Sequence, residues 1–303
     1  MKTNIKFALF FAGLCSINSA FANPIISDNS GTQIQNINNI PVVNISTPDN
    51  RGISYNTYKD FNVDTQGAVL NNSLNQIRSQ LAGQINKNPN LNNPAKLIIN
   101  EVTSGNQSQL NGLLEIAGTK ADVLISNPNG ITANGGSFSN AVNITITTGK
   151  PALDPNGQLM SIVETGKITI REKGLDGYNG GDSVAIVSKA LELNGKIRGK
   201  DLFVLQGSND DINKPALAID TKALGGMYAN NIVIVSSKAG VGVNLGNIES
   251  IGNQGVSVMV QGPLQISGDI LSKGDIVAKA PTININPNSQ VKSTNGQVVL
   301  NRN

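Results

Sequence analysis

The sequence contains no histidine and no tryptophan, and its only cysteine is Cys15. The absence of histidine excludes Ser–His and Cys–His nucleophile pairs, as well as zinc sites built from histidine and cysteine. Charged residues make up only 14% of the chain and no lysine-rich stretch occurs, so the charge pattern does not support binding of nucleic acid or of acidic membranes. Paired carboxylates remain possible for catalysis; we expect no metal or cofactor and, with the candidates weighed below, a protein that is not an enzyme.

The first 22 residues are typical of a secretory signal peptide. Lys2 and Lys6 give a basic start, residues 7–14 form an apolar run too short to span a membrane, and Ala20 and Ala22 form an A-x-A cleavage site. Loss of these two lysines lowers the formal charge from +3 to +1. No later apolar segment is long enough for a transmembrane anchor. We predict an exported chain that begins after Ala22 and has no cysteine.

Short β-branched runs, separated by clusters of Asn, Gly, Asp and Ser, recur through the rest of the chain. In the second half their starts are 18, 30, 24, 20 and 22 residues apart, at Val184, Leu202, Ile232, Val256, Ile276 and Val298. A repeat of about twenty residues with several strands favours a parallel β-helix, with coils about 4.8 Å apart and asparagine at the corners. About a dozen coils would form a rod of roughly 60 Å. An antiparallel β-sandwich is the alternative, because counting every strand also gives spacings of about 8–12 residues.

The segment from Ser73 to Asn93 departs from this pattern. Leu74, Ile77, Leu81 and Ile85 recur at helical spacing before Asn-Pro-Asn breaks the run. The spacing predicts a short helix or an ordered excursion outside the main body. A plain loop is an equal alternative.

Two stretches are weak candidates for chemistry. Asp210 and Asp211 are the best acid pair, but adjacent residues of a strand point to opposite faces, and a polar loop explains them more simply. Residues 177–186, GYNGGDSVAI, are similar to a Gly-Asp calcium repeat, which needs tandem copies to stack its ligands. Only one copy is present, so we interpret it as a turn.

Three stretches of the type Asn-Pro-Asn recur at turn positions. Asn127-Pro128-Asn129-Gly130 suits a type I turn, and Asp154-Pro155-Asn156-Gly157 suits it equally well. Asn286-Pro287-Asn288-Ser289 is close to the same pattern. Because the chain repeats this turn chemistry, the tetrapeptide alone cannot indicate a function.

Its surroundings are more specific. The segments NNIPVVNISTPDNRGISYNTYKDFNV (38–63), NKNPNL (86–91), LIINEVTSGNQSQLNGLLEIAGTKADVLISNPNGITANGGSF (97–138) and ITITTGKP (144–151) follow one another in this order. Together they closely resemble the amino-terminal secretion domain of two-partner secretion exoproteins, a family of filamentous haemagglutinins, haemolysins and contact-dependent inhibition toxins. PALAIDTKALGGMYANNIVIVSSKAGVGV (215–243) resembles the next segment of the haemagglutinin and inhibition-toxin branch. The resemblance covers residues 30–245.

The resemblance implies an all-β fold, a right-handed parallel β-helix with amino-terminal capping strands and small extra-helical elements. It divides the chain into a signal peptide (1–22), a secretion domain (23–250) and continuing coils (251–303), which are the start of a repeat region or a truncated end. It also implies export by the Sec route, recognition of the unfolded chain by the periplasmic POTRA domains of a dedicated outer-membrane β-barrel transporter, and folding at the cell surface of a Gram-negative bacterium. The matching motif residues, which shape turns that the transporter reads or that nucleate folding, are Asn88, Pro89, Asn90, Leu91, Asn127, Pro128, Asn129, Gly130 and Ile131.

Three functions remain in competition. The first is the secretion domain of a haemagglutinin- or adhesin-like exoprotein, with an unidentified cell-surface receptor. The second is the delivery end of a contact-dependent inhibition toxin or a haemolysin without its effector region. The inhibition-toxin branch often has paired cysteines where this chain has TANGGSF, so no thiol role is expected there. The third, a carbohydrate-active β-helix enzyme, is disfavoured because no acid cluster converges.

Overall fold

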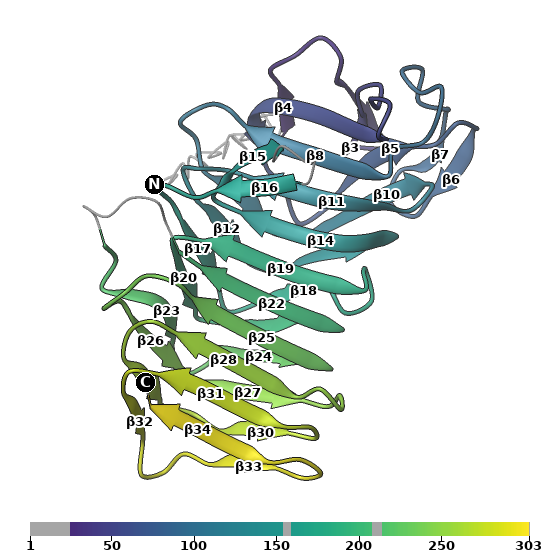
Figure 1. Cartoon of the computed structure of the whole chain (residues 1–303). Coiled ribbons are helices and arrows are strands. Elements are labelled where there is room, and N and C mark those ends of the chain that lie inside the picture. Colours follow the sequence, from purple (N-terminus) through teal and green to yellow (C-terminus); the bar gives the residue numbers. More distant parts are fainter. Residues whose placement is uncertain (1–24, 154–158, 208–213, 303) are drawn as a thin grey trace, which may run out of the picture.

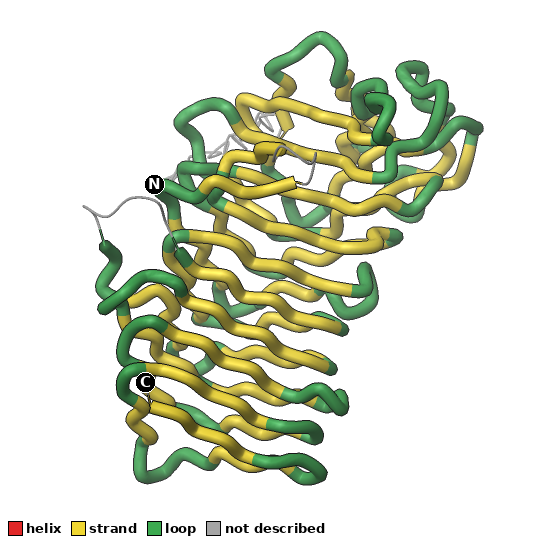
Figure 2. Tube along the Cα trace, viewed as in Figure 1, coloured by secondary structure: helices red, strands yellow, loops and turns green. Residues whose placement is uncertain are grey.

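The computed structural model describes residues 25–153, 159–207 and 214–302, and these residues form a parallel β-helix (Figure 1). The β-helix prediction is confirmed, and the antiparallel sandwich is wrong because nearly all strand pairs of the three main sheets are parallel. Each complete coil contributes one strand to each of three stacked sheets, which we call A, B and C. The chain passes through them in the order A, C, B and then returns to A. Figure 2 shows the described chain as strands and loops without a helix.

Each of the three main sheets stacks its strands in the order of the coils. Sheet A contains β1 (Ile25–Ser27), β4 (Ile53–Phe61), β8 (Leu97–Val102), β11 (Ala121–Ser126), β14 (Ala141–Thr147), β19 (Ser183–Ser188), β22 (Asp201–Gln206), β25 (Asn231–Ser236), β28 (Val256–Val260), β31 (Ile276–Ala280) and β34 (Val298–Arg302). Sheet B contains β2 (Gln33–Ile37), β3 (Ile40–Asn44), β5 (Ala68–Asn72), β10 (Leu113–Gly118), β13 (Gly136–Ser139), β18 (Leu175–Asp176), β21 (Lys196–Arg198), β24 (Gly226–Ala229), β27 (Asn247–Ser250), β30 (Ile270–Ser272) and β33 (Val291–Ser293). Sheet C contains β9 (Ser108–Leu110), β12 (Ile131–Ala133), β17 (Lys167–Ile170), β20 (Ala190–Leu193), β23 (Leu217–Thr221), β26 (Gly242–Leu245), β29 (Leu264–Ile266) and β32 (Ile283–Ile285).

The repeat found in the sequence corresponds to the strand pairing in sheet A. The six run starts pair directly across neighbouring strands and form one column, Val184, Leu202, Ile232, Val256, Ile276 and Val298. The first five of these side chains are buried in one continuous apolar core, while Val298 in the last described coil is exposed. Because the strands of a sheet lie about 4.8 Å apart, eleven of them span about 50 Å, somewhat less than predicted.

The amino-terminal end of the β-helix is covered by antiparallel strands. β1 pairs antiparallel with β4, and β2 pairs antiparallel with β3, which then starts the parallel stack of sheet B. A β-helix exposes unpaired strand edges at its end, and capping strands block their association with other chains. The predicted capping strands are therefore confirmed.

Two antiparallel hairpins lie outside the coils. β15 (Lys150–Leu153) pairs with β16 (Leu159–Ile162), and this hairpin lies over sheet A (Figure 1). β6 (Ile77–Ser79) pairs with β7 (Gly83–Ile85). The helix predicted within Ser73–Asn93 is wrong, and the ordered excursion is right. The apolar side chains of this hairpin are spaced as in a helix because they pack with Val42 and Val69 in a small second core.

Asparagine occupies left-handed turn positions, at the β2–β3 hairpin of the cap and at one corner between β13 and β14. The three described non-glycine residues with positive φ are Asn38, Asn39 and Asn140. Asparagine tolerates this left-handed region better than other side chains. GYNGG forms a turn, as predicted, in which the amide of Gly180 donates to the carbonyl of Gly177 at 3.2 Å. The predicted signal peptide, with Ala20 and Ala22, lies outside the described residues, as do Asp210 and Asp211.

Candidate functional site

The first predicted motif, Asn88 to Leu91, forms a turn whose first side chain is buried. The amide of Leu91 donates to the carbonyl of Asn88 at 3.3 Å, and the amide of Asn90 donates to Asn88 Oδ1 at 2.9 Å. Asn88 Nδ2 donates to the carbonyls of Ile45, at 3.0 Å, and Asn71, at 2.9 Å. Asn88 is 1% exposed, so one carboxamide joins the turn to the cap and to β5 inside the protein.

The third residue of the motif extends this connection to the cap. Asn90 Nδ2 donates to the carbonyls of Gly31, at 2.9 Å, and Ile45, at 3.1 Å, while Thr47 Oγ1 donates to the carbonyl of Asn90 at 2.7 Å. The side chain of Leu91 belongs to the main core, whereas Pro89 is exposed. The motif therefore holds the amino-terminal cap against the first coils.

The second motif, Asn127 to Ile131, has the same local geometry at another corner. The amide of Gly130 donates to the carbonyl of Asn127, and the amide of Asn129 donates to Asn127 Oδ1, both at 3.0 Å. Asn127 Nδ2 donates at 2.9 Å both to the carbonyl of Asn106 and to Ser108 Oγ. Asn127 is fully buried, Pro128 is half-buried, and Ile131 starts β12 in the core.

Gly130 is required by this turn. Its φ of 115° lies in the region that favours glycine, and a Cβ there would lie 3.0 Å from the carbonyl oxygen of Lys167 in the next coil. Its own carbonyl accepts from the amide of Ser108 at 3.1 Å. The turn therefore contacts the coil before it and the coil after it.

The other turns of this type differ. In Asn286–Ser289 the amide of Ser289 donates to the carbonyl of Asn286 at 2.9 Å, but Asn286 is exposed and the bond from Asn288 to its Oδ1 is long, at 3.4 Å. In the described part of the chain, Asn286 Nδ2 donates no hydrogen bond. The turn predicted at Asp154–Gly157 lies outside the described residues. Burial of the first asparagine, rather than the turn itself, distinguishes the two motifs.

The fold does not bring the two motifs together. The first precedes β8 and the second follows β11, its neighbour in sheet A. The start of one parallel strand and the end of the next lie at opposite ends of the sheet (Figure 1). The motifs are therefore two separate turns at different corners of the β-helix and do not form one site.

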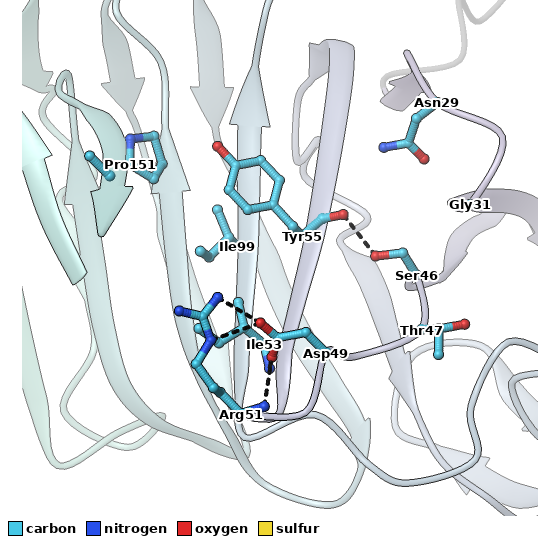
Figure 3. A pocket seen from close by; sticks show the side chains of 11 residues that line it. Asn29, Gly31, Ser46, Thr47, Asp49, Arg51, Ile53, Tyr55, Ile99 and Pro151 are labelled. Carbon is cyan, nitrogen blue, oxygen red and sulfur yellow. Dashed lines mark hydrogen bonds and ion pairs between the residues drawn. The ribbon is translucent and has the colours of Figure 1, made fainter. Parts of the chain in front are cut away.

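The motif predictions did not include a cavity beside the first motif (Figure 3). It has a volume of about 570 Å³ and lies between the cap, β4, β8 and β15; Gly31 and Thr47, which hold Asn90, line it. Asp49 and Arg51 form an ion pair at 2.7 Å on one side, and hydrogen bonds from the Ile53 and Arg51 amides help to lower the pKa of the Asp49 carboxyl. Because the lining comes from four distant segments, no local sequence signal could have indicated this cavity.

Tyr55 forms another wall of this cavity. Its ring is 41% exposed, and its hydroxyl donates to Glu101 at 2.5 Å. Partial burial, and then the bond to Glu101, raises the pKa of Tyr55. No cluster of three or more possible metal ligands occurs among the described residues. The same residues include no helix long and apolar enough to span a membrane.

The fold and the cap define a class of protein, the capped β-helical secretion domains. A solved structure, the filamentous hemagglutinin secretion domain, superimposes with a TM-score of 0.81 and 32% identity over 91% of this chain and 99% of that one. The model of the family "TPS secretion domain" matches residues 22–266. The chain therefore belongs to the TPS secretion domain family, the exported partners of two-partner secretion, which pair with a dedicated transporter.

Much longer proteins share the same amino-terminal region. A tRNA nuclease CdiA of Yersinia mollaretii is 42% identical over 280 residues, which are 87% of this chain and 9% of that protein. A 16S rRNA endonuclease CdiA of Enterobacter cloacae is 47% identical over 242 residues, or 74% of this chain and 7% of that protein. The chain thus spans less than a tenth of these relatives. It represents a secreted, surface-directed exoprotein of the Gram-negative type.

Proposed function

We propose that this chain directs export: after Sec transport into the periplasm it is recognised, unfolded or extended, by the POTRA domains of its partner transporter and folds at the cell surface. Membership of the secretion-domain family supports a transport role for these coils and not a catalytic one. The functional unit is residues 23–250. The coils beyond residue 250 continue the same three sheets.

One observation supports recognition before folding. Asn88 and Asn127 are 1% and 0% exposed in the folded protein, and each carboxamide donates two hydrogen bonds and accepts at least one. A transporter cannot contact side chains in this state. If the transporter recognises these motifs, it does so in the unfolded chain. If it does not, the two turns serve folding alone.

The two roles separate in one experiment. Asn88→Ala and Asn127→Ala would be compared with Asn286→Ala, which changes an exposed turn of the same type. Secretion into the medium is measured in cells with the partner transporter, and refolding is measured with purified protein. Recognition predicts that secretion is lost even when refolding conditions restore the native fold. If secretion falls only in proportion to refolding yield, the motifs serve folding alone.

An exposed position in the same motif adds a second test. Pro89 is exposed and takes part in neither of the two hydrogen bonds that close the turn. Pro89→Ala should leave the fold stable but lower secretion if the transporter reads the sequence Asn-Pro-Asn. Unchanged secretion of Pro89→Ala, together with lost secretion of Asn88→Ala, would assign the first motif to folding.

Two functions are considered for the protein after export. The main proposal is a haemagglutinin- or adhesin-like exoprotein that binds a cell-surface receptor. The names of the relatives favour the second, the delivery end of a contact-dependent inhibition toxin. An adjacent immunity gene, and growth inhibition of a strain lacking that gene in co-culture, would select the second. Loss of polysaccharide cleavage in Asp210→Ala would support the disfavoured enzyme.

A further inference from the structure

The outer face of sheet B has a groove far along the chain from the two motifs. A cavity of about 290 Å³ is lined there by Asp176, Tyr178, Arg198, Tyr228, Glu249 and Ile251, which we call the sheet-B groove. A second cavity, of about 520 Å³, shares Glu249 and Ile251 and continues over β30 and β33. The two cavities form one trough that crosses successive coils along the axis of the β-helix.

The register of sheet B builds this groove. Asp176, Arg198, Tyr228 and Glu249 are direct neighbours on β18, β21, β24 and β27, so their backbones follow one another at about 4.8 Å. The Tyr228 ring folds over Gly226, where a Cβ would lie 2.9 Å from Tyr228 Cε2. The absence of a side chain at residue 226 thus lets an aromatic ring cover the strand. Tyr178, 40% exposed, adds a second ring from the turn after β18.

The charged groups of the groove are not paired with one another. Arg198 and Glu249 lie two strands apart with Tyr228 between them, and neither side chain makes a hydrogen bond or ion pair within the described part of the chain. Asp176 accepts from the amide of Tyr178 at 2.9 Å through Oδ1. The groove therefore offers a donor, two carboxylates and two tyrosines to a ligand at about the spacing of the strands.

This mixture of groups selects a ligand class. A cationic ligand would be repelled by Arg198 and by Lys196, whose Nζ already lies 5.1 Å from the centre of the Tyr228 ring. Within the sheet-B groove an anionic ligand would be repelled by Asp176 and Glu249, whereas Lys273 and Lys292 line only the continuation over β30 and β33. An extended peptide binds strand edges, but β21 and β24 are paired on both sides. Sugar hydroxyls both donate and accept, and the C–H face of a sugar packs against an aromatic ring.

We propose that the sheet-B groove binds a neutral oligosaccharide chain that lies along the axis of the β-helix. Tyr228 and Tyr178 stack against sugar rings, Arg198 donates to hydroxyl oxygens, and Glu249 and Asp176 accept from hydroxyl groups. The continuation over β30 and β33 provides room for further sugar units. This site is separate from the two export motifs, because none of its lining residues lies within Asn88–Leu91 or Asn127–Ile131.

The test uses calorimetric titration of the purified, folded chain with chitohexaose, cellohexaose and maltohexaose. We expect one of the three to bind with a Kd between about 10 μM and 1 mM. Tyr228→Ala and Glu249→Gln should each weaken binding at least tenfold, and Tyr228→Phe, which keeps the ring, should weaken it less. Phe203→Ala is the control, an exposed aromatic residue on β22 of sheet A outside the groove, and should leave the Kd unchanged.

Three results would overturn the proposal. These are absence of binding by all three oligosaccharides at millimolar concentration, binding that Tyr228→Ala does not weaken although its circular dichroism is native, and preferential binding of choline or sulfate. If an oligosaccharide binds, polysaccharide released from bacterial lipopolysaccharide and glycans released from mammalian glycoproteins distinguish a bacterial from a host source. Secretion of the Tyr228→Ala chain should be normal, so failure of this proposal leaves the export role untouched.

Discussion

Replacement of Asn88 by alanine tests whether the buried turn holds the cap to the coils. The substitution removes two hydrogen bonds from Nδ2, to the carbonyls of Ile45 and Asn71, and one to Oδ1 from the amide of Asn90. Each buried hydrogen bond contributes about 1 kcal/mol net, so we expect Asn88→Ala to lower the free energy of unfolding by about 3 kcal/mol. The Ile45 carbonyl keeps its bond from Asn90 Nδ2, which limits the loss.

The measurement is urea unfolding followed by circular dichroism. Asn286→Ala provides the reference, because it changes the same turn chemistry at an exposed site with one weak side-chain bond, and surface changes of this kind stay within about 0.5 kcal/mol. Asn127→Ala should resemble Asn88→Ala, since its carboxamide makes the corresponding bonds. The reasoning fails if Asn88→Ala and Asn286→Ala differ by less than about 0.5 kcal/mol.

Three further changes have defined outcomes. Glu115→Ala removes a buried carboxylate that accepts hydrogen bonds from Ser79 Oγ and the amides of Gln80 and Leu81, at 2.8, 2.8 and 3.0 Å. Limited proteolysis should therefore cleave the β6–β7 hairpin faster. Cleavage at the wild-type rate would show that Glu115 does not hold the hairpin in place. Gly130→Ala should cost about 1–3 kcal/mol in thermal unfolding because of its positive φ, whereas Gly105→Ala, which meets no atom within 4 Å, should be near neutral; equal melting temperatures would contradict this. The bonds from Lys167 and then Asn194 lower the pKa of Glu192 below its ordinary 4.5, so the stability they add is present above that pH and is lost as the pH falls through the folded pKa. The free energy of unfolding measured in urea should therefore differ between wild type and Glu192→Gln by at most about 1 kcal/mol, because the Lys167–Glu192 pair is accessible, and this difference should vanish in acid. A difference that grew in acid would contradict the lowered pKa of Glu192.

The coil repeat was predictable because inward side chains must form ladders. A single column of sheet A passes through Val184, Leu202 and Ile232, and burial forces an apolar residue at each coil. The sequence alone did not exclude a sandwich, since the period-two alternation within a strand is the same in both folds. What decides between them is which strands pair, and pairing is a property of distant segments.

The hairpin at Ile77–Ile85 shows why local spacing misled. Ile85 shares one apolar cluster with Val42 of β3 and Val69 of β5, and Leu81 packs against it, so their spacing reflects a tertiary surface and not a helix face. Glu115, which holds the hairpin, lies more than thirty residues away from it in sequence. The carboxylate gave no local signal, because its three donors are assembled only when the hairpin folds onto β10.

The same limit applies to the motifs. Asn88, Asn127 and Asn286 each begin a turn, and nothing within four residues distinguishes the buried two from the exposed one. The difference comes from partners up to 43 residues earlier in the chain. Flanking segments in the right order carried the information that the tetrapeptide lacked.

The direction of these contacts links the turns to the order of folding. The carboxamide donors of Asn88 and Asn90 bind only residues that precede them, Gly31 to Asn71, and those of Asn127 and Asn129 bind only residues 104–108 beyond their own turn. The side-chain donors of the two motifs therefore need no partner that follows them in the chain. If the coils fold in chain order, these bonds are available as soon as each turn forms, whereas Asn286 makes no such donor bond among the described residues.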